Sequence, residues 1–316
     1  MIKVQADSVN NRLLVRNVMT RVSPSDNLDN FRQLANSPGD RISVQNLRKS
    51  GRMTARERIY ALIDSDSFVE IDAFVQHRSG DHNLHLHRPF GDGVVAGHGM
   101  LDGRRIVCFA QDYSIFEGTM GEMHAKKIAK IAEFAEKSQL PIIGIWDGDG
   151  QRAYEGVPAL GATGELLDIL VACSGRIPII SLVLGTVSGV SALAAGLSDF
   201  VILSSEHGQM FMRSPYFIPE VISGEIDEQT LGGAESHASR SGVACLVADD
   251  EHDAINIAAE ILGYLPDHTL AESFNVNSGD PWDRRCKKLE KIVPSDSNKP
   301  YDMLEVIREV VDEQRF

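Results

Sequence analysis

The chain has 316 residues, 43% of them hydrophobic, and a formal net charge of −14 at pH 7. This length allows one or two domains with a sizeable core, whereas the negative charge disfavours nucleic acid and anionic membrane surfaces as partners. No apolar run reaches the roughly 20 residues that a bilayer span needs, and the opening residues lack the apolar stretch of a secretory signal. We therefore expect a cytoplasmic protein that binds neither nucleic acid nor membrane.

The first part of the chain is polar and lacks a sustained hydrophobic period. "SPSDN" and "NSPGD" interrupt residues 1–40, which we interpret as an N-terminal extension before one main domain over residues 41–316. Within that domain, Thr54 and the glutamate three residues later form the pattern of a capping box, which predicts a helix start. Asp102-Gly103 lies between two apolar runs and predicts the turn of a β-hairpin.

Helices and strands then alternate along the chain. A helix is predicted within residues 118–140. Its apolar face carries Met123, Ile128, Ile131, Ala132 and Ala135, and its polar face carries Lys126, Lys127, Lys130, Glu133 and Lys137. The following strands are predicted over 141–147, 178–185, 200–205 and 243–248, and the following helices over 159–175, 187–198 and 251–266. Such alternation is typical of parallel strands joined by right-handed crossovers.

The residues that commonly bind metal ions give little support for a metal site. The cysteines include no C-x-x-C pair, and Cys108 and Cys245 lie in apolar runs where buried thiols are expected. His77, His82, His85 and His87 lie close together, and His85-x-His87 could bind a metal from one face of a strand. Because only one acidic residue stands nearby, we favour a solvated loop and predict no metal.

Two junctions in the sequence combine a strand, a glycine-bearing loop and a helix. They are "IGIWDGDGQRAYEGVPALG" at 143–161 and "PIISLVLGTVSGVSALAAG" at 178–196. If the strands are parallel, both loops lie at one sheet edge, next to helix N-termini whose N–H groups lack intrahelical partners. Two such loops can form an oxyanion hole, and glycine allows close approach of the backbone to a ligand.

Other interpretations of these loops are available. Ordinary tight turns between strand and helix would have the same glycines. A dinucleotide-binding fingerprint is excluded because "GDGQRA" ends in alanine, and a phosphate-binding P-loop is excluded because neither loop contains G-K-[ST].

Several long motifs follow one another in a characteristic order. They are "GRMTARERIYALIDSDSFVEID", "FGDGVVAGHGMLDGRRIVCFAQDYSIFEGTMGEMHAKKIAKI", "DGDGQRAYEGVPALG", "EQTLGGAESHASRSGVA" and "IVPSDSNKPYDMLEVIREVVDE". From about Asn46 to the end, the chain resembles the N-terminal half of the carboxyltransferase β subunit of biotin-dependent acyl-CoA carboxylases of the propionyl-CoA and acetyl-CoA type. The resemblance implies an α/β, crotonase-like fold in which ββα units spiral into one domain.

The resemblance also implies an activity. A carboxyl group would move from carboxybiotin to the α-carbon of an acyl thioester, through an enolate held by backbone amides and without a side-chain general base. The implied cofactors are biotin, on a partner carrier protein, and a coenzyme A thioester as substrate. The implied partners are the biotin carrier and a subunit that supplies the C-terminal carboxyltransferase half, within an oligomer; the chain would be either a split subunit or a fragment.

The motifs of the resemblance also assign site residues. The expected catalytic groups are the backbone amides of Gly150, Gly189 and Val190. The expected cofactor-binding residues are Arg56, Gly148, Asp149, Arg152 and Ser188. For Arg56, contact with the coenzyme A nucleotide and an ordinary surface ion pair both remain open.

The loops depart from the family pattern at several positions. Asp149 and Gln151 replace small residues and would narrow or acidify the acyl pocket. Asp149 must turn away from a developing enolate or pair with a cation such as Arg152 or Arg213. Val190 replaces a glycine, keeps its N–H and adds a β-branched side chain. Two alternatives therefore stand: a biotin-independent decarboxylase of malonyl-type thioesters, and a non-catalytic structural subunit.

Overall fold

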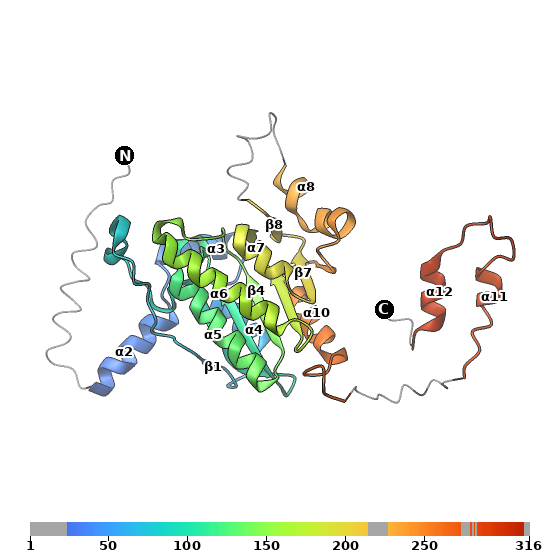
Figure 1. The fold of residues 1–316 in the computed structure, drawn as a ribbon, viewed down its shortest axis with the longest axis horizontal. Helices are drawn as coiled ribbons and strands as arrows, with labels where there is room; N and C mark the ends of the chain where they lie inside the picture. The colour runs from blue at the N-terminus through green and yellow to red at the C-terminus, as the bar shows by residue number, and fades with distance from the viewer. Residues whose placement is uncertain (1–23, 214–226, 273–278, 280, 282, 313–316) are drawn as a thin grey trace. The chain divides into compact units, whose positions relative to one another are not determined.

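The computed structural model describes residues 24–213, 227–272, 279, 281 and 283–312 (Figure 1). The chain divides into two compact units, Met1–Glu272 and Ser273–Phe316. Expectations for residues 1–23 and 214–226, including the stretch that follows Arg213, lie outside the described residues.

The first unit contains most of the regular structure. Its longer helices are α2 (Pro24–Asn36), α3 (Arg41–Lys49), α4 (Ala55–Leu62), α5 (Glu122–Ser138), α6 (Val157–Cys173), α7 (Gly189–Gly196) and α10 (Glu251–Tyr264), and its short helices are α8 (Glu228–Gly232) and α9 (Ala234–Ser236). Its strands are β1 (Val69–Glu70), β2 (Val94–Leu101), β3 (Arg104–Gln111), β4 (Ile142–Trp146), β5 (Ile179–Val183), β6 (Thr186–Ser188), β7 (Phe200–Ser204), β8 (Gln209–Phe211) and β9 (Leu246–Ala248). The second unit contains α11 (Leu289–Ile292) and α12 (Met303–Val310).

The main sheet has seven strands in the order β1-β2-β3-β4-β5-β7-β9. The first three strands pair antiparallel, and each pair from β3 to β9 is parallel. A second, parallel sheet joins β6 to β8. The parallel strands predicted from the alternation are therefore confirmed, although β6 is an additional short strand between β5 and α7.

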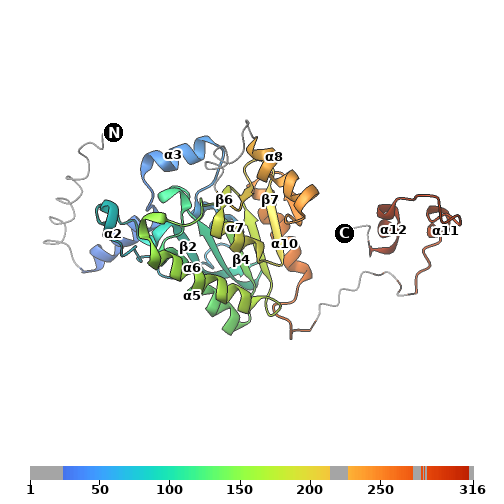
Figure 2. The same ribbon diagram turned by 45° about the horizontal axis from the view of Figure 1, so that its top comes forward.

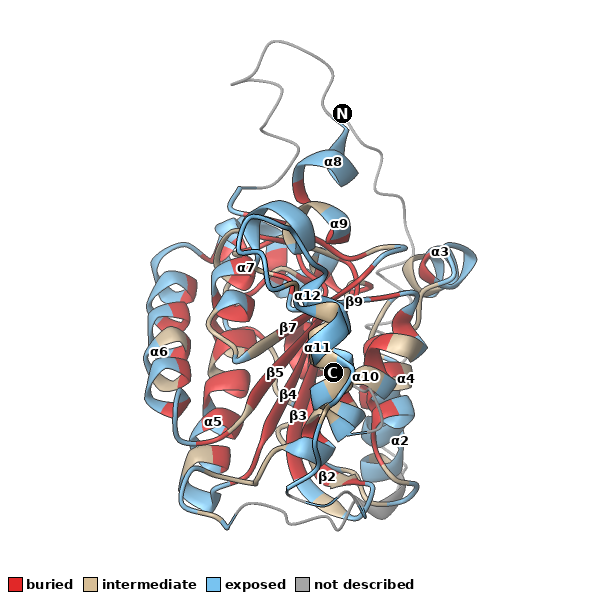
Figure 3. Ribbon diagram, turned by 90° about the vertical axis from the view of Figure 1, so that its right-hand side faces the viewer, coloured by how far each residue is buried: buried red, intermediate tan, exposed pale blue. Residues whose placement is uncertain are grey.

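Helices cover both faces of the main sheet (Figures 2 and 3). Ile179 and Val183 of β5 belong to the apolar core shared with α5, α6 and α7. Ile180 and Leu182 belong to the opposite core, shared with α4 and α10. Because successive strand residues point to opposite faces, this two-sided burial explains why the central strands are continuously apolar.

Two local predictions are confirmed. Thr54 caps α4 in a capping box with Glu57, in which each side chain bonds to the backbone N–H of the other residue. Asp102 and Gly103 connect β2 to β3 with φ values of 49° and 75°, the left-handed region required by a tight hairpin turn.

Other local predictions are wrong. Lys127, placed on the polar face of its helix, is 2% exposed because its ammonium donates to the Val94 carbonyl oxygen at 2.8 Å. Cys245 is exposed, since it precedes β9 at the sheet edge. His77, assigned to a solvated loop, is buried and bonds through Nε2 to the His87 carbonyl oxygen at 2.7 Å. Helix α2 forms within residues 1–40, where no regular element is predicted.

Across the part of the chain that the structure describes, none of the helices is both long enough and apolar enough to cross a bilayer.

Candidate functional site

Two glycine-bearing segments meet at the carboxyl edge of the parallel strands. β4 and β5 pair in register from Ile142↔Ile179 to Trp146↔Val183, so both strands end at the same edge. Residues 147–151 follow β4, and β6 with the start of α7 follows β5. The predicted juxtaposition of the two glycine loops is therefore present.

The two segments are hydrogen-bonded to each other. The Ser188 N–H donates to the Gly148 carbonyl oxygen at 3.3 Å. The Ser188 hydroxyl donates to Asp149 Oδ1 at 2.6 Å. The Ser188 hydroxyl thus holds Asp149 against the opposite segment. The two expectations for Asp149, that it turns away from the enolate or pairs with a cation such as Arg152 or Arg213, stay predictions.

Glycine is needed where the segments touch. Gly150 has a φ of 70°, and a Cβ built there would lie 3.2 Å from both the carbonyl oxygen and the hydroxyl oxygen of Ser188. Gly189 has a φ of 55°, and a Cβ there would lie 3.9 Å from the Gly150 Cα. A larger residue would strain the backbone at both positions, and at Gly150 its Cβ would also crowd Ser188.

Not every expected amide is available to a ligand. The Gly150 N–H donates to the Gly148 carbonyl oxygen at 2.9 Å, so its expected catalytic role stays a prediction that requires this bond to open. The pairing of Ser188 with Phe211 in the β6–β8 ladder directs the Gly189 N–H toward β8, because N–H groups alternate in direction along a strand.

Val190 is better placed as a donor. It is the second residue of α7, where the N–H has no intrahelical acceptor, and Ser188 at the N-cap makes no side-chain capping bond. Within the described residues, the Val190 N–H has no hydrogen-bond acceptor. Its β-branched side chain is accommodated in the helix and is partly exposed.

The backbone N–H of Gln151 is a second available donor. The sequence pointed to Gln151 only for its side chain, not for this N–H. Gly150 and Arg152 on either side bond to the backbone of Met120, at 2.8 Å and 2.9 Å. These bonds use the Gly150 carbonyl and the Arg152 N–H, which both face Met120. The Gln151 N–H therefore points away from Met120 and has no acceptor within the described residues. One indication that this position matters was present in the sequence: Gln151 stands where the family pattern has a small residue.

Arg152 lies beneath the loop. It is 2% exposed, and its Nη1 donates to Asp92 Oδ1 at 2.6 Å and to Glu155 Oε1 at 2.7 Å. Burial raises the pKa of Asp92, although the neighbouring Arg152 opposes the effect. The guanidinium therefore anchors the segment, and its expected contact with a cofactor stays a prediction.

Arg56 forms an ion pair in this structure. Its Nη2 donates to Glu70 Oε2 at 2.7 Å and to the Ala35 carbonyl oxygen at 3.3 Å. Of the two alternatives left open by the sequence, the structure contains the ion pair, here with Glu70. Coenzyme A binding by Arg56 stays a prediction.

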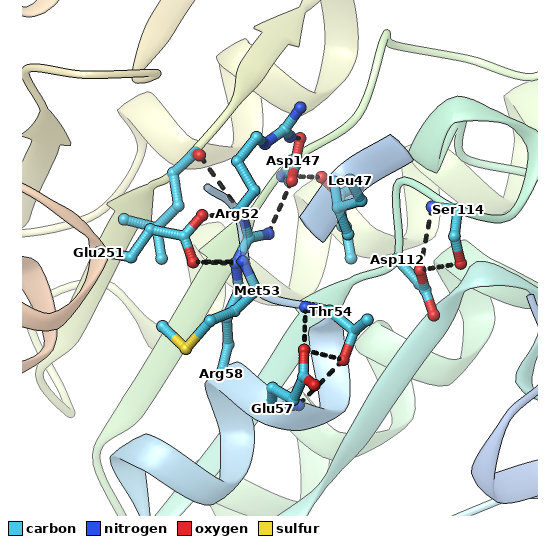
Figure 4. A network of polar contacts seen from close by, with 12 residues as sticks. Leu47, Arg52, Met53, Thr54, Glu57, Arg58, Asp112, Ser114, Asp147 and Glu251 are labelled. Carbon is cyan, nitrogen blue, oxygen red and sulfur yellow. Dashed lines mark hydrogen bonds and ion pairs between the residues drawn. The ribbon is translucent and has the colours of Figure 1, made fainter. Parts of the chain in front are cut away.

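A buried network of charges precedes the glycines (Figure 4). Asp147 is fully buried and accepts hydrogen bonds from Arg58 Nη1 at 2.7 Å and from Arg52. Arg58 also binds Glu251 through Nε at 3.0 Å. Burial alone would lower the pKa of Arg58, but the two carboxylates outweigh it and raise that pKa above the usual value. The network fixes the point where the segment leaves β4.

A pocket of about 440 Å³ opens beside the first segment. Its lining includes Ser43, Asn46, Arg52, Tyr113, Phe116 and Glu117. The Glu117 carbonyl oxygen accepts from the Asp149 N–H at 3.2 Å, which places the pocket next to the loop. The Arg52 guanidinium lies 4.8 Å from the centre of the Tyr113 ring.

Two relatives are similar to this chain in sequence. The biotin-dependent acetyl-/propionyl-coenzyme A carboxylase beta5 subunit of Mycobacterium leprae is 40% identical over 286 residues, covering 88% of this chain and 52% of that protein. The methylmalonyl-CoA decarboxylase subunit alpha of Veillonella parvula is 39% identical over 278 residues, covering 88% of this chain and 55% of that protein. The chain spans about half the length of these relatives.

A solved structure and a family match complete the comparison. The crystal structure of transcarboxylase 12S with hydrolysed methylmalonyl-coenzyme A bound has a TM-score of 0.86 and 31% identity, covering 92% of this chain and 56% of that chain. This likeness confirms the predicted α/β, crotonase-like fold. The carboxyl transferase domain family matches residues 46–316. The chain therefore belongs to the carboxyl transferase domain family, as its motifs predict, and its relatives include β subunits of acyl-CoA carboxylases.

Proposed function

We propose that this protein transfers a carboxyl group to the α-carbon of an acyl-coenzyme A thioester. The observation that carries the proposal is the pair of Gln151 and Val190 N–H groups, which have no acceptor among the described residues and lie on two segments that touch at the strand edge. The similarity of this chain to carboxylase β subunits supports carboxyl transfer as the class of reaction.

The two amides would act on the thioester oxygen. When the α-proton is removed, negative charge develops on that oxygen, and two fixed N–H donors stabilise it. Loss of one such donor typically costs about 3 kcal/mol of transition-state stabilisation. Since the amides are held by packed backbone, they need little reorganisation as the charge develops.

The carrier part of the thioester needs space next to these amides. The pocket of about 440 Å³ beside Glu117 falls within the size range of small-ligand sites. Ser43, Asn46 and Arg52 provide polar groups along its wall.

The carboxyl group would come from carboxybiotin on a partner carrier protein. The matched regions cover 52% and 55% of the two relatives. We propose that a C-terminal carboxyltransferase half, from a separate subunit or a longer chain, completes the biotin side of the site. The working form would be an oligomer of such units.

A decarboxylase acting on malonyl-type thioesters is the second candidate. The relative from Veillonella parvula favours it, because loss of CO₂ from such a thioester produces the same enolate and can use the same amides. A structural subunit without catalysis is the third candidate.

One experiment separates these candidates. The complex is purified from its own cells through a tag on this chain and is supplied with ATP, labelled bicarbonate and acetyl- or propionyl-CoA. Label in the acyl-CoA, abolished by avidin, is the expected result. Avidin-resistant release of CO₂ from malonyl-CoA would instead indicate the decarboxylase. Assembly with neither activity and without thioester binding would indicate a structural subunit.

A further inference from the structure

Gln111 lies directly beneath the two amide-bearing segments. It is the last residue of β3, the neighbour of β4, and its side chain is completely buried. A polar side chain buried in the middle of a sheet costs free energy unless its hydrogen bonds are made. The partners of Gln111 therefore show what this position contributes.

The side-chain amide of Gln111 bonds to both segments. Its Oε1 accepts from the Asp147 N–H at 3.0 Å, immediately before the first glycine. Its Nε2 donates to Ser191 Oγ at 3.5 Å, in the first turn of α7. A Cβ built on Gly148 would meet the Gly118 backbone first and would lie 3.1 Å from Gln111 Oε1, so Gln111 also lies close to the first glycine of the loop. One side chain thus spans the bases of the two segments.

His124 fixes the orientation of that amide. Its Nδ1 lies 3.1 Å from the Asp92 carbonyl oxygen, which can only accept, so the proton resides on Nδ1. Nε2 is then an acceptor and faces Gln111 Nε2 at 3.3 Å. Burial, followed by the charges of Arg152 and Lys127, lowers the pKa of His124 well below its usual value and keeps the ring neutral. A flipped Gln111 amide would oppose its NH₂ to the Asp147 N–H and its oxygen to the His124 Nε2 acceptor, and it would lose the bonds to both residues.

We propose that Gln111 is a positioning residue that sets the separation between the Gln151 and Val190 amides. It touches neither substrate nor reacting atoms and acts through Asp147 and Ser191. The bond between the Ser188 hydroxyl and Asp149 joins the two segments directly, whereas Gln111 joins them through Asp147 and Ser191 from below. This inference rests on the proposed function, because the separation matters only if both amides bind one oxygen.

Two coenzyme A probes measure the separation without turnover. A coenzyme A thioether that ends in a nitronate mimics the enolate, and S-ethyl coenzyme A carries no such charge. The ratio of their dissociation constants, measured by calorimetry on the purified complex, reports the amide geometry and is unaffected by a fraction of unfolded protein. Misplacement of an interacting group by about 1 Å can cost on the order of a hundredfold in rate, so a large change in the ratio is expected.

Gln111→Met keeps the approximate volume and removes the side-chain hydrogen bonds to Asp147, Ser191 and His124. We expect it to reduce the preference for the nitronate by about tenfold or more, with S-ethyl coenzyme A bound as in the wild type. Gln111→Glu keeps an acceptor for the Asp147 N–H and should retain more of the preference than Gln111→Met. Ser181→Ala is the matched control, because it removes the equally buried partner of Trp146 Nε1 in the same core, at 2.7 Å.

The outcomes are distinct. A nitronate preference lost in Gln111→Met and kept in Ser181→Ala supports the inference. An unchanged preference in Gln111→Met, or an equal loss in Ser181→Ala, overturns it and leaves the proposed function intact. If the wild type shows no nitronate preference, the proposed function fails, and the positioning role fails with it.

Discussion

Arg58 Nη1 donates to Asp147 Oδ2 at 2.7 Å, and both side chains are almost wholly inaccessible to solvent. The two residues are 89 positions apart in the sequence. Their bond connects α4 to the end of β4, where the first amide-bearing segment begins, so the charged pair is part of the support of the site.

Removing one member of this pair should be costly. Arg58→Met leaves the buried Glu251 carboxylate without its guanidinium and removes one of the two guanidinium partners of Asp147. Breaking a buried ion pair from one side typically costs about 3–5 kcal/mol. Urea unfolding of the variant measures this loss of stability. Arg48→Ala is the control, because the Arg48–Glu57 ion pair is exposed by 60% and 41% and should contribute about 1 kcal/mol or less. Equal losses in the two variants would contradict the account.

The capping box of α4 gives a smaller prediction. Thr54→Ala removes the hydroxyl that accepts from the Glu57 N–H at 3.3 Å. Loss of such a cap typically costs about 1 kcal/mol, and Thr54→Ser should recover most of it. Thermal unfolding of both variants tests the prediction, which fails if serine and alanine behave alike.

Lys127 predicts how stability depends on pH. Burial lowers its pKa from 10.5 to about 8, with Glu70 opposing the effect. Between these values the unfolded chain binds more protons than the folded one, so the Lys127 contribution to stability increases as pH rises from about 8 to 10.5. Each pKa unit corresponds to about 1.4 kcal/mol.

A variant isolates this contribution. The free energy of unfolding of the wild type minus that of Lys127→Met should increase across this interval, and below pH 8 the difference should be constant. Urea titrations at several pH values give the difference directly. A difference that stays flat or decreases between pH 8 and 10.5 would show that the lysine is not held in the described environment.

Asp149 predicts the charge preference of the acyl site. Its carboxylate belongs to the first segment and bonds to Ser188. Asp149→Asn keeps a side-chain oxygen for that bond and removes a charge, which at about 4 Å repels a substrate carboxylate by about 1 kcal/mol in water. Methylmalonyl-CoA should therefore bind several-fold more tightly to the variant, relative to propionyl-CoA. An unchanged ratio by calorimetry would place Asp149 too far from the acyl group to act.

Local sequence patterns determined much of the fold. The capping box at Thr54 and the Asp102-Gly103 turn depend on neighbouring residues, and the alternation of buried strands with helices implied the parallel sheet. The cap and the turn were correctly predicted because each is determined within one helix or one hairpin, and the parallel sheet because strands and helices alternate regularly along the chain.

Features that depend on distant parts of the chain were missed. Lys127 has a charged side chain at a surface-like helical position, and its burial depends on the Val94 carbonyl, 33 residues away, and on an ion pair with Glu70. The Arg58–Glu251 contact spans 193 residues.

The site shows the same division. Glycine spacing located the two segments, but the availability of each N–H to a ligand depends on distant partners. The bridge to Met120 turns the Gln151 N–H away from that partner, and pairing with Phe211 directs the Gly189 N–H toward β8. Sequence spacing alone could not reveal Gln111, whose role depends on the neighbour relationship between β3 and β4.

The central claim is that the Val190 amide holds the developing enolate oxygen. Val190→Pro deletes this N–H at the second position of a helix, where proline is tolerated, and Val190→Ala keeps the N–H while removing the β-branch. The measurement is the rate of avidin-sensitive carboxylation of propionyl-CoA by the purified complex. The account predicts a loss in kcat of about a hundredfold or more for Val190→Pro, with Val190→Ala near the wild type. Wild-type activity in a folded Val190→Pro protein would contradict it.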